Sequence, residues 1–319
     1  MPSHNRANKI SPLLAVFIAI LAVSTASPLI RFSQQEASSI VVAAYRLGLA
    51  SLLLFPFAAA RASKEIGVLR FPQKILLAFS GLFLALHFAS WITSLQYTSV
   101  ASSVVLVSTT PLWVAILSPV LLGEKLSPET WIGLTVAILG GVIVGTSSQC
   151  SWGAGGITCS SLFNLANKSD ALGNFLAVIG AWCAAGYLLI GRRLRPLLTL
   201  NSYTFGVYGL ASVFLLLGVW VTGSSLTGYR PITYIWFLSL AVIPQLIGHS
   251  TFNWSLKYLS ASYVSIAMLG EPVGTIILTF FLLGEKPSLL ELIGGVLILG
   301  GITIATDLES KAVAGRGSS

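Results

Sequence analysis

The sequence predicts an all-α polytopic membrane protein whose ten transmembrane helices form two inverted five-helix repeats. The first reason is composition, because the 319 residues are 55% hydrophobic and only 9% charged, whereas soluble domains carry about a quarter charged residues. The second is that apolar runs of about 18 residues or more recur, each able to cross a hydrocarbon layer of roughly 30 Å. The third is a segment that occurs twice. Backbone polar groups in lipid need internal partners and no alternating barrel pattern is present, so the runs are expected to be helices.

The predicted spans follow one another with short connections. They are 11–30, 37–60, 73–96, 99–121, 128–147, 171–190, 201–222, 232–256, 259–282 and 288–307. The first resembles a signal peptide, because Arg6 and Lys9 precede it and the small residues "STAS" occupy 24–27. We interpret it as a retained helix, since its removal would leave an odd number of spans and unbalance the repeat. The longest connection, about 148–170, is rich in Gly, Ser and Asn.

Lysine and arginine residues set the orientation of the spans. With the N-terminus inside, the inner segments hold thirteen of these residues and the outer segments four, with Arg46 left inside a span, out of eighteen in all. We therefore expect a multi-pass protein of the cell (inner) membrane with both termini in the cytoplasm. The net charge of +8 is spread over short loops beside the bilayer rather than gathered in one patch, so no nucleic-acid partner is expected.

The internal repeat is the strongest signal. "TPLWVAILSPVLLGEKLS" at 110–127 aligns with "EPVGTIILTFFLLGEKPS" at 271–288 at a constant offset of 161, and the same offset maps "SLQY" at 94–97 onto "SLKY" at 255–258. Agreement across successive helices without a gap is a duplication rather than chance.

The repeat divides the chain into 1–150 with spans one to five and 151–319 with spans six to ten. Five is odd, so the two copies cross the membrane in opposite senses, with the first LLGEK loop inside and the second outside. Inverted repeats are typical of secondary transporters, because exchanging the shapes of the halves converts an inward-open state into an outward-open one.

The segments "PLWVAILSPVLLGEKLSPETWIGLTVAILGGVIVG" and "EPVGTIILTFFLLGEKPSLLELIGGVLILGGITIAT", with the ten spans and the duplication, resemble the EamA branch of the drug/metabolite transporter superfamily. The resemblance implies a central cavity built from spans three, four, eight and nine with parts of one and six. It also implies small organic solutes, often exported amino acids. Such sequences often carry a Glu-Pro pair in both halves, whereas here the first copy reads Thr110-Pro111, so a symmetric pair of carboxylates is absent.

Two ionisable residues fall near mid-membrane. Arg46 lies nine residues into span two, roughly 14 Å, and Glu271 twelve residues into span nine, roughly 18 Å. An ionisable group at that depth is a functional candidate by default; the alternative is a salt bridge that only holds helices together. Because Pro272 cannot donate a backbone hydrogen bond, span nine is expected to break there.

Other polar and aromatic residues share helix faces. His87 and Trp91 share one face of span three, and Gln245, His249 and Asn253 share one face of span eight. The second stripe either lines a wet face or makes interhelical hydrogen bonds, and both interpretations stay open.

Trp113 and Trp182 lie mid-span, where they either stack on a planar solute or simply pack. The predicted substrate-binding residues are Glu271, Arg46, His87, Trp91, Thr110, Trp113, Trp182, Gln245, His249 and Asn253, with Pro111 and Pro272 as hinges.

Cysteines and small residues give weaker signals. Cys150 and Cys159 share the predicted outer loop and are able to form a disulfide in an oxidising compartment, while their spacing argues against a metal site. A stripe of small residues at four-residue spacing in span five predicts a close helix contact, within one monomer or between two. Its members are Gly133, Ala137, Gly141 and Gly145.

The sequence therefore predicts a secondary transporter, an exporter of small organic metabolites such as amino acids, that works by alternating access around a mid-membrane cavity. The alternatives are an exchanger of nucleotide-sugar, sugar-phosphate or nucleoside type, a non-transporting membrane protein, and an intramembrane enzyme. No HExxH, GxSxG or nucleotide-binding motif is present, so no enzymatic activity, cofactor or metal is expected. The expected partners are a small-molecule solute and the lipid bilayer, with proton coupling left open and a monomer favoured over a homodimer.

Overall fold

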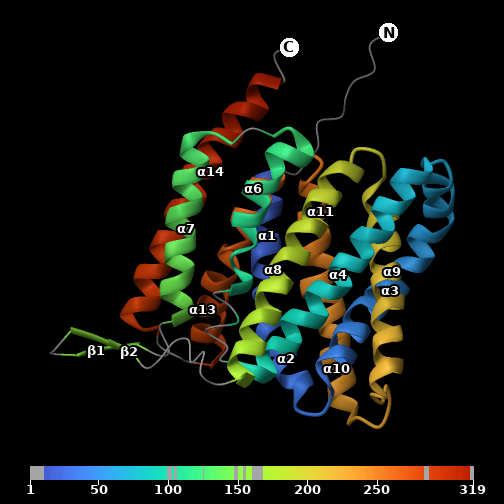
Figure 1. Cartoon of the computed structure of the whole chain (residues 1–319), viewed down its shortest axis with the longest axis horizontal. Coiled ribbons are helices and arrows are strands. Elements are labelled where there is room, and N and C mark those ends of the chain that lie inside the picture. Colours follow the sequence, from blue (N-terminus) through green and yellow to red (C-terminus); the bar gives the residue numbers. More distant parts are fainter. Residues whose placement is uncertain are drawn as a thin grey trace.

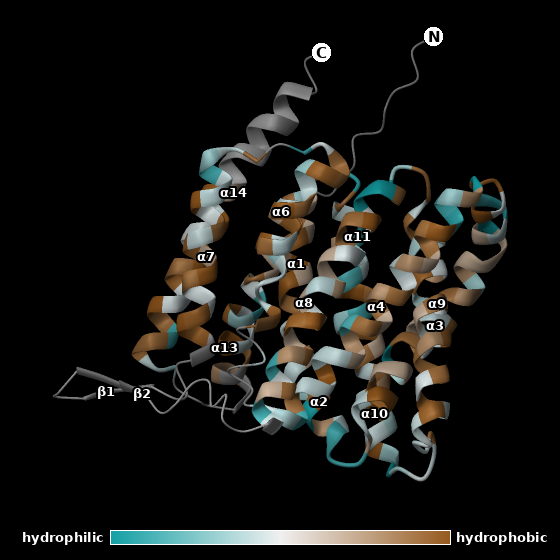
Figure 2. Cartoon of the chain, in the orientation of Figure 1, coloured by the Kyte–Doolittle hydropathy of each residue, from teal (hydrophilic) through white to brown (hydrophobic). Residues whose placement is uncertain are grey.

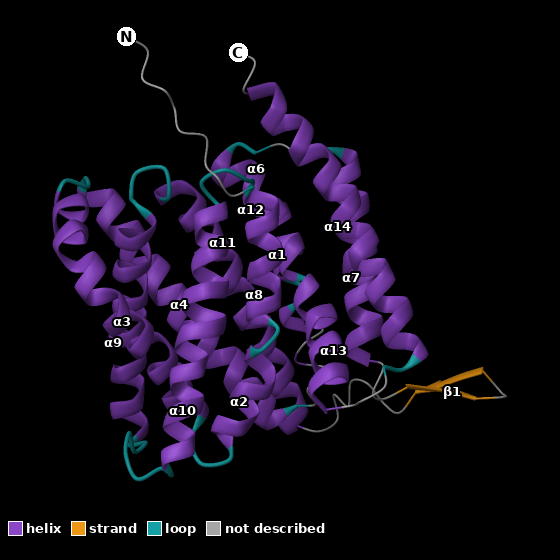
Figure 3. Cartoon of the chain, turned by 180° about the vertical axis from the view of Figure 1, so that it is seen from behind, coloured by secondary structure: helices purple, strands orange, loops and turns teal. Residues whose placement is uncertain are grey.

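The structure, a computed structural model, describes residues 11–98, 103, 106–124, 126–146, 150–153, 156–159, 168–283 and 287–316. These residues form a bundle of helices and one short hairpin that projects from it (Figures 1 and 3). The helices of the first half are α1 Pro12–Val23, α2 Ala26–Gln34, α3 Ser39–Gly67, α4 Phe71–Tyr97, α6 Thr110–Leu122 and α7 Pro128–Thr146. Those of the second are α8 Lys168–Leu194, α9 Leu200–Thr222, α10 Pro231–Leu240, the π-helix η2 Ala241–His249, α11 Ser250–Ser255, α12 Ala261–Met268, α13 Gly270–Leu283 and α14 Leu289–Arg316.

The helices match the ten predicted spans. Within the described residues, seven stretches are long and apolar enough to cross a membrane, and three shorter apolar helices complete the set: Thr110–Leu122, Pro128–Val144 and Leu289–Ala305. Hydrophobic residues run along the helices and hydrophilic ones gather at the ends and loops (Figure 2). Large apolar side chains such as Val120 and Trp220, 82% and 80% exposed, lie on the surface of the bundle, as expected where lipid is the solvent.

The repeat extends to the ends of the helices. Under the offset of 161 the start of α3 maps onto the start of α9, the end of α6 onto the end of α13, and the start of α7 onto the start of α14. The pairs are Ser39 and Leu200, Leu122 and Leu283, and Pro128 and Leu289. The predicted fold class, two inverted five-helix repeats, is confirmed.

The first span differs from the prediction because it is interrupted. α1 ends at Val23 and α2 begins at Ala26. A proline has no N–H to bond the carbonyl four residues earlier, and Pro28 therefore frees the carbonyl of Ser24. That oxygen instead accepts a hydrogen bond from the hydroxyl of Thr275 in α13, at 3.0 Å.

Spans four and nine are interrupted in the same way. α6 begins at Thr110 after a turn, and Pro111 frees the carbonyl of Val107, which accepts from the Thr110 hydroxyl at 2.8 Å. In span nine the break falls at Leu269, between α12 and α13. Span nine is therefore broken as the sequence predicts, but the break precedes Pro272, which stands in the first turn of α13, where a missing N–H is tolerated.

Helices α7 and α14 pack against each other at one edge of the bundle (Figure 1). This packing shows what the small-residue stripe of span five contacts. A Cβ added to Gly140 would lie 2.6 Å from the carbonyl oxygen of Gly294, and one on Gly133 would lie 2.7 Å from that of Gly301. At Gly141, by contrast, nothing lies within 4 Å. The strict four-residue spacing was wrong, because 3.6 residues per turn brings position i+7 rather than i+8 onto the contact face. The contact lies within one chain.

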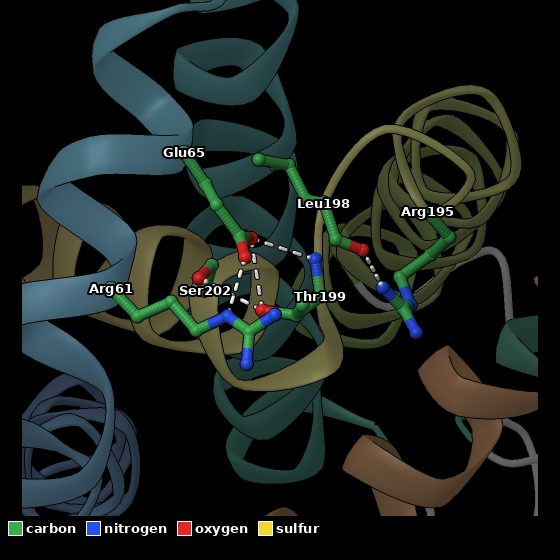
Figure 4. A network of polar contacts seen from close by, with 6 residues as sticks. All are labelled: Arg61, Glu65, Arg195, Leu198, Thr199 and Ser202. Atoms are coloured by element: carbon green, nitrogen blue, oxygen red, sulfur yellow. Dashed lines mark hydrogen bonds and ion pairs between the residues drawn. The ribbon is translucent and has the colours of Figure 1, made fainter.

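Polar networks at the two ends of α3 fasten the halves together. Near one end, Glu65 accepts hydrogen bonds from the Thr199 backbone N–H at 2.8 Å and its hydroxyl at 2.9 Å, and pairs with Arg61 at 2.7 Å (Figure 4). Beside it Arg195 donates to the Asn253 carbonyl at 2.8 Å. The carboxylate therefore binds the backbone N–H and the hydroxyl of Thr199, the N-cap residue of α9.

The loop before α3 carries the matching network at the other end. Glu36 accepts from the Thr233 hydroxyl at 2.6 Å and from the backbone N–H of Arg230 at 3.0 Å, and it pairs with the Arg230 side chain. These hydrogen bonds, with that of Thr233 the largest contribution, lower the pKa of Glu36 from 4.5 to about 2. The carboxylate thus fixes the start of α10.

The long connection between the halves holds the hairpin, which the sequence did not predict. β1 Cys150–Gly153 pairs antiparallel with β2 Gly156–Cys159, and the register sets Cys150 opposite Cys159.

Candidate functional site

A cavity lies where the interrupted spans meet. Its walls come from both halves, and six of the predicted binding residues line it together with the predicted hinge Pro111. The lining residues are Val23, Ala26, Arg46, His87, Trp91, Val107, Ser108, Thr110, Pro111, Ala184, His249, Ser265, Met268, Leu269 and Glu271. The broken helices are thus set against a cavity inside the bundle that is lined in part by polar side chains, the place where irregular backbone is tolerated in a membrane protein.

The cavity wall follows the internal repeat. Several of its members occur as pairs 161 residues apart, one from each half, so the repeat axis passes through the cavity. The pairs are Val23 with Ala184, Val107 with Met268, Ser108 with Leu269, and Thr110 with Glu271. Only the last pair joins a neutral residue to an ionisable one, so the wall is symmetric in position and asymmetric in charge.

Arg46 is held on the cavity wall by its neighbours. Its side chain is 1% exposed, and Nε donates to Oε1 of Gln245 at 2.8 Å. The guanidinium carbon lies 4.1 Å from the centroid of the Phe88 ring, a cation–π contact. Within the described part of the chain, Nη1 and Nη2 have no hydrogen-bond partner. One edge of the guanidinium is therefore fixed and the other is unpaired.

Glu271 is fixed through its backbone and not through its carboxylate. The Glu271 carbonyl accepts hydrogen bonds from the hydroxyls of Ser24 and Thr275, both at 3.0 Å, which ties the break in span one to the break in span nine. Among the described residues, no ion pair or hydrogen bond reaches the Glu271 carboxylate, and none joins it to Arg46. The first turn of α13 suits a negative charge.

The histidines and Trp91 form an aromatic wall. Nδ1 of His87 donates to the Gly180 carbonyl at 2.9 Å, and the His87 ring stacks on Trp91 with centroids 5.8 Å apart. Nε1 of Trp91 is buried and has no partner among the described residues. The edge of His249 meets the Phe88 ring at 5.4 Å.

Four predicted residues lie away from the cavity wall. Gln245 holds Arg46, and Asn253 donates to the His249 carbonyl at 2.8 Å and to the Tyr187 hydroxyl. Both residues are buried, and each makes one hydrogen bond to another span, Gln245 to Arg46 and Asn253 to Tyr187. Trp113 and Trp182 pack edge to face with centroids 5.2 Å apart, and Trp182 is 45% exposed on the outside of the bundle.

Sequence reasoning missed the apolar members of the wall. Val23, Ala184, Met268 and Leu269 carry no chemical signal of their own, because an apolar residue in an apolar helix looks the same on every face. The repeat relates them to one another and to Val107 and Ser108, but the offset of 161 carries no predicted binding residue onto any of the four.

Comparison with known proteins gives concordant results. A model of the EamA-like transporter family matches residues 10–146 and again residues 171–306. An uncharacterized transporter of Archaeoglobus fulgidus is 25% identical over 291 residues, which cover 91% of this chain and 94% of the relative. The uncharacterized transporter YdfC of Bacillus subtilis is 24% identical over 82% of this chain and 79% of its own. A solved crystal structure has the same fold, with a TM-score of 0.75, 20% identity, and coverage of 94% of this chain and 98% of the other.

Proposed function

The chain belongs to the EamA-like transporter family and is a multi-pass membrane transporter rather than an enzyme, and we propose that it exports small amine-bearing metabolites such as amino acids. Transport would proceed by alternating access around the cavity, with both termini in the cytoplasm.

The carboxylate of Glu271 carries this proposal. It lies on the cavity wall at a helix break, where transporters place their binding sites, and among the described residues no hydrogen bond or ion pair reaches it. Its repeat counterpart is the uncharged Thr110, so the cavity presents one carboxylate rather than two. A single carboxylate in a site shielded from water selects a solute group that is positively charged or rich in N–H donors.

The packing of helices from the two halves of the chain supports alternating access. α6 comes from the first half and α12 from the second, and they contact each other on one side of the cavity, with the Ser262 hydroxyl 3.4 Å from that of Ser118. We assign this closed side to the cytoplasm from the distribution of positive charge. Motion of one half relative to the other would separate these helices and open the cavity to that side.

A sugar-phosphate or nucleotide-sugar exchanger is less well supported. A phosphate with two negative charges calls for several cationic groups, and Arg46 is the one lysine or arginine among the described residues that line the cavity.

The variant Glu271→Gln tests the proposal because it keeps the shape and removes the charge. Purified protein is first screened by thermal shift against the common amino acids, nucleosides and a hexose phosphate, because a ligand of the folded state raises its apparent stability. Counterflow of the best ligand is then measured in proteoliposomes. We expect transport by Glu271→Gln to fall about tenfold or more, as for loss of one charge-assisted hydrogen bond, with an unchanged elution profile.

Glu291→Gln is the matched control. Glu291 lies in the first turn of α14, and its carboxylate accepts from the Ser288 backbone N–H at 2.7 Å, a contact that glutamine also makes. This variant should transport as the wild type does. Wild-type counterflow by Glu271→Gln would refute the assigned role of the carboxylate.

A further inference from the structure

The buried side chains around the cavity have more donors than acceptors. Within the described part of the chain, five buried side-chain atoms have no hydrogen-bond partner: Nη1 and Nη2 of Arg46, Nε1 of Trp91, Nε2 of Gln245 and Oδ1 of Asn253. Four of the five atoms are nitrogens that carry N–H groups. Three of these nitrogens lie on the cavity wall, two of them on Arg46 and one on Trp91. Buried polar groups are nearly always paired in native proteins, so this cluster calls for an acceptor that the described residues do not supply.

The three donors on the wall belong to side chains that lie beside the same aromatic ring, that of Phe88. The Arg46 guanidinium carbon lies 4.1 Å from its centroid, and the centroid of the Trp91 ring lies 6.5 Å from it. Gln245 occupies Nε of Arg46, which leaves the edge formed by the two terminal nitrogens. Trp91 is held in turn by stacking on His87. The donors are therefore fixed in place before any solute arrives.

An acceptor with one negative charge and a planar shape fits this arrangement. The two terminal nitrogens of a guanidinium bind both oxygens of a carboxylate in parallel. Charge balance favours the same group, because a carboxylate neutralises Arg46 as an amine neutralises Glu271. The two side chains line the same cavity without an ion pair between them, so a solute that carries both charges completes both sites.

We propose that the terminal nitrogens of Arg46 and the indole N–H of Trp91 form a binding site for the carboxylate of the solute, opposite a Glu271 site for its amine. This rests on the proposed function and narrows its substrate class to zwitterions of the α-amino acid type. Amines that lack a carboxylate are then poor substrates.

The test compares each amino acid that stabilises the wild type with its primary amide, which keeps the amine and loses the negative charge. Affinities are measured by thermal shift and by inhibition of counterflow. We expect the amide to bind the wild type about tenfold or more weakly, the order of magnitude of a lost hydrogen bond to a charged group. In Arg46→Gln this discrimination should shrink to about twofold, because glutamine cannot form the charged fork.

Trp91→Phe keeps the test decisive if Arg46→Gln fails to fold. Phenylalanine keeps an aromatic ring beside His87 and removes the N–H group together with part of the indole, so the preference for the acid over the amide should fall severalfold with normal protein yield. Unchanged discrimination in a folded Trp91→Phe or Arg46→Gln would overturn the assignment of these donors.

The outcomes separate this inference from the proposed function. Equal binding of acid and amide by the wild type, with transport still lost in Glu271→Gln, would overturn the carboxylate site and leave the amine site standing. Failure of every amine-bearing compound to bind would overturn the proposed function itself.

Discussion

Glu124 and Arg192 join the two halves of the molecule at the end where α6 ends and α12 begins. Nε of Arg192 lies 2.6 Å from Oε1 of Glu124, and the other carboxylate oxygen accepts from the Ala261 backbone N–H at 3.3 Å. Arg192 also donates to the Leu256 carbonyl at 2.7 Å. Glu124 belongs to the first LLGEK segment, so this duplicated motif serves as a contact between halves on the closed side of the cavity.

Removing this contact should favour opening at that side. In a cysteine-free background, Ser262→Cys places a buried thiol between α12 and α6 as a reporter. We expect Glu124→Gln to raise its rate of maleimide labelling about threefold to fivefold, since a partly exposed ion pair contributes up to about 1 kcal/mol. Glu291→Gln removes a charge from the first turn of α14, where the carboxylate bonds only its own helix start among the contacts named above, and should leave the labelling rate unchanged.

The repeat supplies a variant with the opposite effect. The offset of 161 carries Arg192 onto Arg31 and Glu124 onto Glu285. Arg31 is exposed on α2, and Glu285 lies outside the described residues. If the halves exchange shapes, these two charges should meet when the other side closes. Glu285→Gln should then slow labelling of the Ser262→Cys reporter, and faster labelling in both variants would contradict an exchange of shapes.

Two neighbouring glycines of α7 should respond differently to the same substitution. Gly140→Ala places a methyl group against the backbone of α14 and should lower stability by about 1–3 kcal/mol through overpacking. Gly141→Ala meets open space and should be neutral or slightly stabilising, because alanine favours a helix. Thermal unfolding in detergent measures both. Equal melting temperatures would show that the backbones of the two helices do not approach so closely.

The Glu36 network predicts part of the acid sensitivity. The pKa of Glu36 is lowered from 4.5 to about 2 in the folded state, so its contribution to stability is complete above about pH 4.5 and is lost as the pH falls towards 2. Melting temperatures from about pH 6 to pH 3 should therefore fall less steeply in Glu36→Gln than in the wild type. Parallel curves would mean that the carboxylate is not held by Arg230 and Thr233.

Some features of the fold and the cavity can be predicted from the sequence and others cannot, depending on how strongly the residue type constrains the structure. Glu271 and Arg46 stand out because a charge within an apolar run is costly, and both line the cavity. The interruption at Ser24 was missed although Pro28 marks it in the same way as Pro272 marks span nine.

The depth of a residue in the membrane is easier to predict from sequence than the face of the helix on which its side chain lies. Trp113 and Trp182 were placed mid-span, yet they pack on each other away from the cavity, because position along a span says nothing about the direction of a side chain. In span eight the π-helix around Pro244 changes the rotation per residue, so His249 reaches the cavity while Gln245 and Asn253 contact neighbouring helices.

The glycine contact between α7 and α14 also fixes an order of assembly. The two helices begin 161 residues apart, and at about 5–20 residues synthesised per second the second emerges roughly 10–30 s after the first. During that interval α7 lies in the bilayer with its glycine face uncovered, next to lipid or to another nascent chain. The contact between α7 and α14 therefore forms late in biosynthesis. A ribosome that stalls before α14 leaves the glycine face of α7 without a partner in its own chain.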